Sequence, residues 1–546
     1  MEDAKKSDPA QGIGLQKGLQ RLLVGARIFL EAEDRICEAA AAGDGSAELL
    51  APEEFIEQVL GISVLRYPDS TIVLCRGDTC VVLENSGRRM AMGLEKVSPE
   101  TKPFTEDGIL YVPLTAVCRG FGYELSVRPG DVRVCLEKGG SCKSRKLPRS
   151  YDYRKTGRST KVRNQGSYGT CWSFASLSAL ETALLPEISG EFSADHMSLH
   201  NSFSLDQKDG GEFAMSMAYL LAWQGPVTEE EDPYGDGVSP DGLKPAVHVQ
   251  EIQILPSRDF KAIKQAVFLY GGVQSSLYTS LTGSDSRSAF YNEENSSYCY
   301  QGDEIFNHDV VIVGWDDEYP KENFQMVPEG DGAFLCVSSW GEEFGDDGYF
   351  YVSYYDSNIG RNGLVYTGIE PPDNYDSIYQ SDLCGWVGQV GYGEETAYGA
   401  AVYEAEKGEF LRAAGFYATG DGTSYEISVV HHMEGEESLQ NRKKVAGGTV
   451  PYSGFYTVPL REPEWLEEGE RFALVLKVST PETVHPIAVE YQADDATAAV
   501  DVTDGESYIS LDGSRWEPLE ERYQCNLCLK GYGDASPESR KNIWIR

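Results

Sequence analysis

The chain has 546 residues, of which 41% are hydrophobic, and its formal net charge is −40. At about 150 residues per domain, this length predicts three or four domains. So large a negative charge argues against nucleic acid or an anionic membrane surface as a partner. The sequence contains no apolar run of about 18 residues or more, so we expect no membrane span.

Residues 1–50 are predicted to hold one amphipathic helix, because apolar side chains recur at helical spacing from Leu15 to Leu30. A linker of small residues is expected behind this helix. The apolar patch at 22–30 is interrupted by Arg27 and lacks a cleavage-site pattern, so it does not predict a signal peptide.

Residues 51–142 are predicted to form a small α/β module. Short β-rich runs separated by turn residues occur at 71–74, 81–83, 110–112 and 132–136. The segment resembles the small domain at the N-terminus of copper amine oxidases and on many bacterial surface proteins. It contains no histidine, so the resemblance does not imply copper. It implies a surface-association or inhibitory module, with a plain spacer as an equal alternative.

A basic cluster at residues 143–149 marks the junction with the next region of this acidic chain. An exposed basic linker is a natural site for cleavage by trypsin-like enzymes. One hypothesis is that residues 1–146 are a removable pro-segment. An ordinary charged linker is an equally strong interpretation.

The most informative motif is Asn-Gln-Gly-Ser-Tyr-Gly-Thr-Cys-Trp-Ser-Phe-Ala at residues 164–175. It places Cys171 between a glycine-containing loop and an apolar helix predicted over 171–185. The positive field of a helix N-terminus favours the thiolate, which is the nucleophilic form of cysteine. Gln165, just upstream, can supply a hydrogen-bond donor to an oxyanion. The motif therefore indicates a cysteine hydrolase, provided that a base is present.

The candidate base is His308, which precedes a β-branched apolar run at 310–313 that predicts a buried strand. It lies 137 residues after Cys171, within the ~130–150 typical of papain-like peptidases. A third block, at 337–350, contains Ser-Ser-Trp-Gly and, further on, Gly-Tyr. With these three blocks in this order, residues 147–369 resemble the papain family of cysteine peptidases.

The same region divides into a helical half and a strand-rich half. The predicted helices cover 171–185, 195–204 and 215–223, and the predicted strands cover 273–278, 310–314, 333–337 and 349–354. We expect an active-site cleft between the halves, with the nucleophile and the base on opposite walls.

The resemblance implies catalytic roles for a small set of residues. Cys171 is the expected nucleophile, His308 the general acid and base, and Gln165 the side-chain donor to the oxyanion. The backbone N–H of Cys171 would complete the oxyanion hole. Ser338 stands where the family has the asparagine that orients the histidine. Trp340 would shield the hydrogen bond of that histidine from water.

The resemblance also implies a set of substrate-binding residues, and this set includes Trp340. Gly210 and Gly211 resemble the paired glycines of the family, whose missing Cβ atoms allow an extended peptide to approach closely. Phe213, Ser276 and Asp309 fall where the family lines the pocket for the second residue before the cut.

Two departures from the family pattern affect the site. A serine hydroxyl at Ser338 can accept a hydrogen bond but is shorter than asparagine, so a water is expected to bridge the gap. We therefore predict a weakened enzyme or a shifted pH profile. Tyr168 stands where the family has a cysteine that staples the loop beside the nucleophile, so this loop is expected to be held by packing alone.

Residues 374–532 are predicted to form a β-sandwich, because short β runs alternate with glycine-rich turns at 410–418, 424–430, 472–478 and 487–491. In this position the segment resembles the lectin-like domain attached to bacterial cell-surface cysteine peptidases. The resemblance raises calcium and a cell-surface glycan as ligands. The acidic stretch 492–495 lacks the alternating ligand spacing of an EF-hand loop and is better explained as a solvated turn.

The sequence as a whole predicts an α+β chain, in which a papain-like two-lobed peptidase is flanked by a small N-terminal α/β module and a C-terminal β-sandwich. The expected function is a secreted or cell-surface bacterial endopeptidase that acts on protein or peptide substrates without a cofactor. The alternative is a catalytically impaired papain-like scaffold that serves as a surface binding or adhesion protein.

Overall fold

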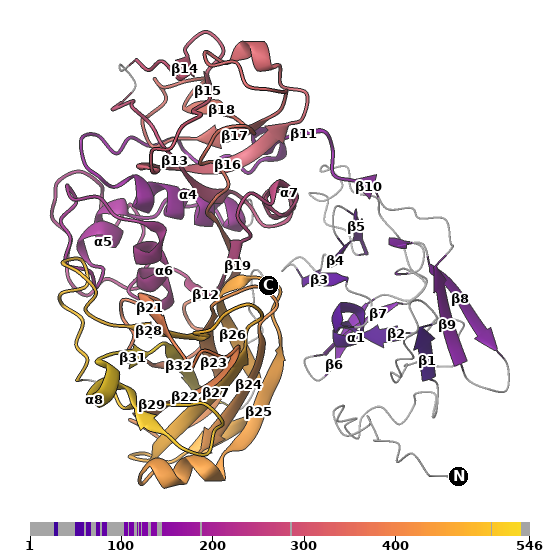
Figure 1. Ribbon diagram of the computed structural model, residues 1–546, viewed down its shortest axis with the longest axis vertical. Coiled ribbons are helices and arrows are strands. Elements are labelled where there is room, and N and C mark those ends of the chain that lie inside the picture. The colour runs from indigo at the N-terminus through magenta and orange to yellow at the C-terminus, as the bar shows by residue number, and fades with distance from the viewer. Residues whose placement is uncertain are drawn as a thin grey trace. The chain divides into compact units, whose positions relative to one another are not determined.

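The computed structural model describes residues 145–185, 188–283, 287–503 and 505–536, together with separate short stretches between residues 27 and 138. The chain divides into two compact units, Met1–Leu147 and Pro148–Arg546. Figure 1 labels the helices and strands of the units. In the described part of the chain, no helix is long and apolar enough to span a membrane.

The described part of the first unit is mainly β-structure. Its elements are β1 (Arg27–Leu30), β2 (Leu50–Pro52), α1 (Glu53–Gln58), β3 (Ser63–Arg66), β4 (Ile72–Arg76), β5 (Thr79–Val82), β6 (Phe104–Glu106), β7 (Ile109–Pro113), β8 (Tyr123–Arg128), β9 (Arg133–Lys138) and β10 (Arg145–Lys146). The predicted strand runs coincide with β4, β5, β7 and β9. The resemblance of this module to copper amine oxidase domains stays a prediction.

The prediction of an N-terminal helix is wrong for residues 27–30, which form strand β1. β1 pairs in parallel with β9, which supplies the backbone hydrogen bonds that a helix would have made internally. Helical spacing of apolar residues could not reveal this partner about a hundred positions away. The rest of the predicted helix lies outside the described residues.

The second unit begins with a helical layer and a strand-rich layer. Its first elements are β11 (Ser150–Asp152), α4 (Cys171–Leu184), α5 (Ala194–Leu199), α6 (Phe213–Leu221), β12 (His248–Leu255), α7 (Phe260–Leu269), β13 (Val273–Leu277), β14 (Tyr291–Asn292), β15 (Ser297–Tyr298), β16 (His308–Asp316), β17 (Ala333–Val337), β18 (Tyr349–Ser353) and β19 (Gly363–Glu370). α4 packs against β16, β19 and α6. The apolar run Val310–Val313 in β16 is buried because neighbours cover both faces of the strand.

The rest of this unit is a β-sandwich that shares a sheet with the first part. It comprises β20 (Ser377–Tyr379), β21 (Gly388–Val390), β22 (Thr396–Glu404), β23 (Glu409–Ala418), β24 (Ser424–Val430), β25 (Lys443–Thr449), β26 (Ser453–Leu466), β27 (Arg471–Ser479), β28 (Ile487–Glu490), β29 (Ser507–Ser510), β30 (Glu517–Pro518), α8 (Leu519–Tyr523), β31 (Asn526–Leu527) and β32 (Leu529–Asp534). Alternate residues of β23, β24 and β27 point into one core between the two main sheets.

The two parts of the second unit are joined through β12. This strand pairs with β19 on one side and with β26 of the sandwich on the other, so one sheet of thirteen strands runs through both parts (Figure 1). Thr457 Oγ1 donates to Gln250 Oε1 at 2.7 Å across this seam. Nearby, the Trp223 ring stacks on His248 with centroids 3.8 Å apart. The sandwich is therefore a structural extension of the first part.

Candidate active site

Cys171 is the first residue of α4, and the helix places its side chain at the edge of the buried core. α4 is buried on nearly all sides, and its first residue is the half-exposed exception at this end. The backbone N–H of Asp309, the second residue of β16, is close enough to the thiol to lower its pKa. The fold therefore brings Cys171 against the strand that carries His308.

His308 is the first residue of β16, and its imidazole is held on two sides. Nε2 lies 3.1 Å from Ser338 Oγ, so no bridging water is needed and that expectation is corrected. The Ser338 hydroxyl reaches His308 directly because β17, which ends at Val337, pairs with β16. Trp340 stacks on the ring at a centroid distance of 4.2 Å and an angle of 11°. His308, Ser338 and Trp340 are all buried.

Gln165 is fixed in one orientation by hydrogen bonds at both ends of its amide. Ser339 Oγ donates to Gln165 Oε1 at 2.6 Å, and Gln165 Nε2 donates to Tyr168 O at 2.7 Å. The backbone is also anchored, because Gln165 N–H donates to Ser339 O at 2.8 Å. Among the described residues, Tyr168 O is the one acceptor of Gln165 Nε2, so its second hydrogen is available.

The loop that contains Tyr168 is held by hydrogen bonds as well as packing, which corrects the expectation of packing alone. Tyr234 Oη donates to Gln165 O at 2.8 Å, and Thr170 Oγ1 donates to Tyr234 Oη at 2.7 Å. Gly169 N–H donates to Gln207 O at 2.8 Å. Tyr234 thus ties the two ends of the loop together in place of a disulfide.

Gly210 and Gly211 lie beside the nucleophile, and both positions require glycine. Gly210 has a φ of +88°, a conformation that L side chains rarely adopt. A Cβ on Gly211 would approach Trp172 Nε1 to 2.4 Å, and a Cβ on Gly169 would meet Gly210 Cα at 2.8 Å. The missing side chains therefore allow this segment to pack against the nucleophile loop.

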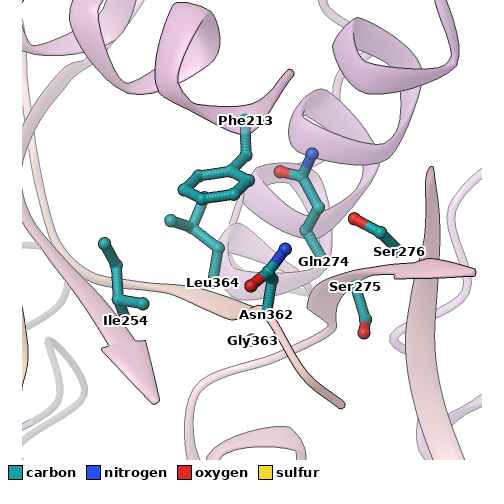
Figure 2. Close-up of a pocket in the computed structure, with 8 residues that line it drawn as sticks. All are labelled: Phe213, Ile254, Gln274, Ser275, Ser276, Asn362, Gly363 and Leu364. Carbon is teal, nitrogen blue, oxygen red and sulfur yellow. The ribbon is translucent and has the colours of Figure 1, made fainter. Parts of the chain in front are cut away.

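Phe213, Ser276 and Asp309 come together around one small pocket. Phe213 and Ser276 line the pocket with Gln274, Leu364 and others (Figure 2). Asp309 lies behind them, where its two carboxylate oxygens accept from Ser276 Oγ at 2.6 Å and from Gln274 Nε2 at 2.9 Å. Burial raises the pKa of Asp309 to about 6, although these two hydrogen bonds lower it.

The electrostatics of the candidate pair differ from the expected thiolate. Burial, together with the negative charge of Asp309, raises the pKa of Cys171 to about 12. Burial lowers the pKa of His308 to about 3. Loss of water and a nearby carboxylate outweigh the field of the helix N-terminus. Both shifts favour the neutral form of the side chain.

The acidic stretch considered for calcium forms a local turn. Asp494 Oδ1 accepts from the backbone N–H groups of Ala496 and Thr497. Within the described ranges, no group of three or more His, Cys, Asp and Glu side chains is placed to hold a metal ion.

Three residues at the site were not predicted from the sequence. Ser339 adjoins the predicted Ser338 but had no distinguishing signal, and neither did Tyr234. Gln274 carried one, because it is the first of three polar residues in the fully buried strand β13. Such polar residues need buried partners and so indicate a site.

Comparisons with known proteins agree with this geometry. The model of the papain family of cysteine proteases matches residues 147–368, and the model of the lectin-like domain matches residues 378–533. Mouse cathepsin K is 28% identical over 211 residues, and mouse pro-cathepsin H is 27% identical over 212 residues. These matches cover 37% and 38% of this chain. The chain spans about three fifths of the length of both relatives.

Two solved structures resemble this chain over 71% of its length. One is the clostridial cysteine protease Cwp84 after propeptide cleavage, with a TM-score of 0.63 and 27% identity over 71% of this chain and 99% of that chain. The other contains the cysteine protease and lectin-like domains of Cwp84, a surface layer associated protein of Clostridium difficile. It has a TM-score of 0.62 and 27% identity, and it covers 71% of this chain and 89% of that chain. The chain therefore carries a papain-like cysteine peptidase domain followed by a lectin-like domain.

Proposed function

We propose that the chain is a cysteine endopeptidase that cleaves peptide bonds through Cys171 and His308. The thiol proton passes to His308 Nδ1, since Nε2 is engaged by Ser338, and the sulfur attacks the scissile carbonyl. Gln165 Nε2 and the Cys171 N–H stabilise the oxyanion. The protonated imidazole then releases the amine, and water resolves the thioester.

One observation carries this proposal. The helix that begins at Cys171 packs against the strand that begins at His308, while His308 is fixed by Ser338 and Trp340. The experiment that tests it is an acid quench during turnover of a peptide ester, followed by mass spectrometry of the protein. A mass increase equal to the acyl group, located on Cys171, is expected. Turnover without this adduct would contradict the covalent route.

Ser338 is proposed to orient His308, and its hydrogen bond sets a measurable part of the rate. Loss of one neutral hydrogen bond is worth about 1 kcal/mol, so we expect Ser338→Ala to lower kcat by about fivefold with little change in KM. Ser338→Asn is expected to raise kcat. Ser280→Ala, at an exposed serine, is the matched control. If Ser338→Asn gives no rise, the serine does not limit the rate.

We also propose that residues 1–146 are a pro-segment of an extracellular or cell-surface enzyme. The boundary between the two compact units falls after Leu147, and the solved Cwp84 structures concern a protein described as surface layer associated and as cleaved at a propeptide. The partners of the enzyme proposed here would be protein or peptide substrates. Its lectin-like domain would contact a cell-surface glycan or the cell wall.

Limited trypsin digestion is expected to release a stable fragment that begins near Leu147, with a gain in peptidase activity. Arg149, close to this junction, is exposed, as a cleavable linker requires. The N-terminal sequence of the fragment and its rate on a peptide substrate are the two measurements. A double variant with Arg145→Gln and Lys146→Gln controls for cleavage elsewhere. A fragment without increased activity would leave these residues as a spacer.

A further inference from the structure

Tyr234 lies in the middle of a chain of hydrogen bonds that joins the two ends of the nucleophile loop. Its Oη donates to Gln165 O at 2.8 Å, so the hydrogen of the Tyr234 hydroxyl is used in this bond. Thr170 Oγ1 lies 2.7 Å from the same hydroxyl oxygen and therefore donates to it. Burial raises the pKa of Tyr234 to about 12, so the hydroxyl keeps its proton at neutral pH. The two bonds run in one direction, which strengthens both.

The two ends of this chain adjoin the two donors of the proposed oxyanion hole. At one end, Gln165 supplies its side-chain amide. At the other end, Thr170 is the N-cap of α4, and its carbonyl accepts the first backbone hydrogen bonds of the helix at 3.0 and 3.1 Å. The next residue is Cys171, whose N–H is the second donor. The hydroxyl of Tyr234 therefore governs the separation between the two donors.

This link connects Gln165 to the helical layer of the fold. The backbone N–H and Oε1 of Gln165 both bond to Ser339, which follows β17 in the strand-rich layer. The loop between Gln165 and α4 contains Gly166, with a φ of +65°, and Gly169. Glycine permits many backbone conformations, so this short loop does not enforce one geometry by itself. The hydrogen bonds of Tyr234 supply the missing constraint.

Tyr234 is itself fixed through its ring and its backbone. The ring meets Phe174 of α4 edge to face, with centroids 4.7 Å apart and an angle of 81°. The N–H of Tyr234 donates to Glu229 Oε1 at 2.9 Å. The N–H of Gly235 donates to Oδ2 of the fully buried Asp195 at 2.8 Å. A support held in this way can keep a catalytic group within about 0.5 Å of its productive position.

We infer that Tyr234 is a positioning residue of the oxyanion hole, whose hydroxyl sets the distance between Gln165 and the N-terminus of α4. This inference rests on the proposed function, because it concerns the same reaction. A tyrosine thus takes the role expected of the cysteine that Tyr168 replaces, and a hydrogen-bonded link stands in for a covalent one.

The first test is Tyr234→Phe in the full chain, which removes the hydroxyl and keeps the ring. Donors to an oxyanion act in the transition state. We therefore expect kcat for a peptide substrate to fall about tenfold, as for the loss of two neutral hydrogen bonds, with KM within about twofold. Thr170→Val should also lower kcat, whereas Thr170→Ser, which keeps the hydroxyl, should retain it. An unchanged kcat for Tyr234→Phe would overturn the inference.

Tyr319→Phe is the matched control. Tyr319 is a buried tyrosine of the same domain, and its Oη donates to a backbone carbonyl, Asn295 O, at 3.0 Å. This variant loses a hydrogen bond of the same kind and should keep kcat.

A double-mutant cycle separates positioning from folding. If Tyr234 acts by placing Gln165, Tyr234→Phe should cost about tenfold in kcat in the wild-type chain but about threefold or less in a chain that already carries Gln165→Ala. A loss of stability alone would lower kcat by the same factor in both chains. Equal factors would therefore contradict the assignment.

Alkylation of Cys171 by iodoacetamide provides a readout that does not use the oxyanion hole. The sulfur displaces iodide from a methylene carbon, and no negative charge develops on a carbonyl oxygen. Tyr234→Phe should therefore be labelled at Cys171 at the wild-type rate while its kcat is reduced. A labelling rate that falls in parallel with kcat would show a general disturbance of the loop and would exclude the specific role.

Failure of this inference and failure of the proposed function give different results. If the wild-type chain cleaves no peptide, the proposed function fails. If it cleaves peptides and Tyr234→Phe has the same kcat, only the role of Tyr234 fails.

Discussion

Replacement of Cys171 by alanine is expected to abolish peptide hydrolysis, lowering kcat by about 10⁴-fold or more, as for removal of other covalent nucleophiles. The fold should survive, because Cys171 is half-exposed at the start of α4 and alanine favours helices. Rates with a peptide substrate and the thermal unfolding midpoint are the two measurements.

Cys299→Ala is the matched control for this variant. Cys299 is a buried free thiol of the same domain, and burial raises its pKa to about 12, as for Cys171. It should retain kcat while losing some stability from the small cavity left behind. Hydrolysis by Cys171→Ala at the wild-type rate would show that Cys171 is not the nucleophile.

Replacement of Gln165 by alanine is expected to lower kcat by about 10²- to 10³-fold, with a smaller effect on KM. A donor to an oxyanion acts mainly in the transition state, where the negative charge develops. Ser339→Ala should give a smaller loss, because it frees the amide to rotate without removing it.

The control for Gln165 is Gln440→Ala, at an exposed glutamine of the lectin-like domain that donates to Ser514 O. It should leave kcat unchanged. A rise in KM with a matching fall in kcat/KM for Gln165→Ala, with kcat intact, would place Gln165 in substrate binding instead.

Several features of the site could be predicted from the sequence because they are local or rest on a motif. α4 begins at Cys171 as expected, and β17 has the predicted bounds of Ala333–Val337. Periodicity and flanking turn residues determine such elements. The order of the three motifs predicted that His308 lies near Cys171, even though neither residue alone is informative.

Other features depend on contacts that no local pattern encodes. β12 mixes Gln250, Glu251 and Gln253 with apolar residues, so no apolar run marks it as a strand. Its partner β26 lies about two hundred residues further along the chain, and only the folded structure gives their register. The link from Tyr234 to the loop of Tyr168 is non-local in the same way.

The pKa of the Cys171 thiol depends on the fold for a related reason. A helix N-terminus can be predicted from sequence, but the partial burial of Cys171 and the nearness of Asp309 cannot. These two effects raise the thiol pKa, so the proposed mechanism starts from a neutral pair and transfers the proton during attack.

The most direct test of the proposed nucleophile is selective alkylation with iodoacetamide at neutral pH, followed by peptide mass spectrometry and an activity assay. We expect Cys171 to be labelled before the buried thiols such as Cys336 and Cys528, with peptide cleavage lost in proportion to the label. Complete labelling of Cys171 with peptide cleavage intact would contradict its role as nucleophile. It would favour a scaffold whose function is binding.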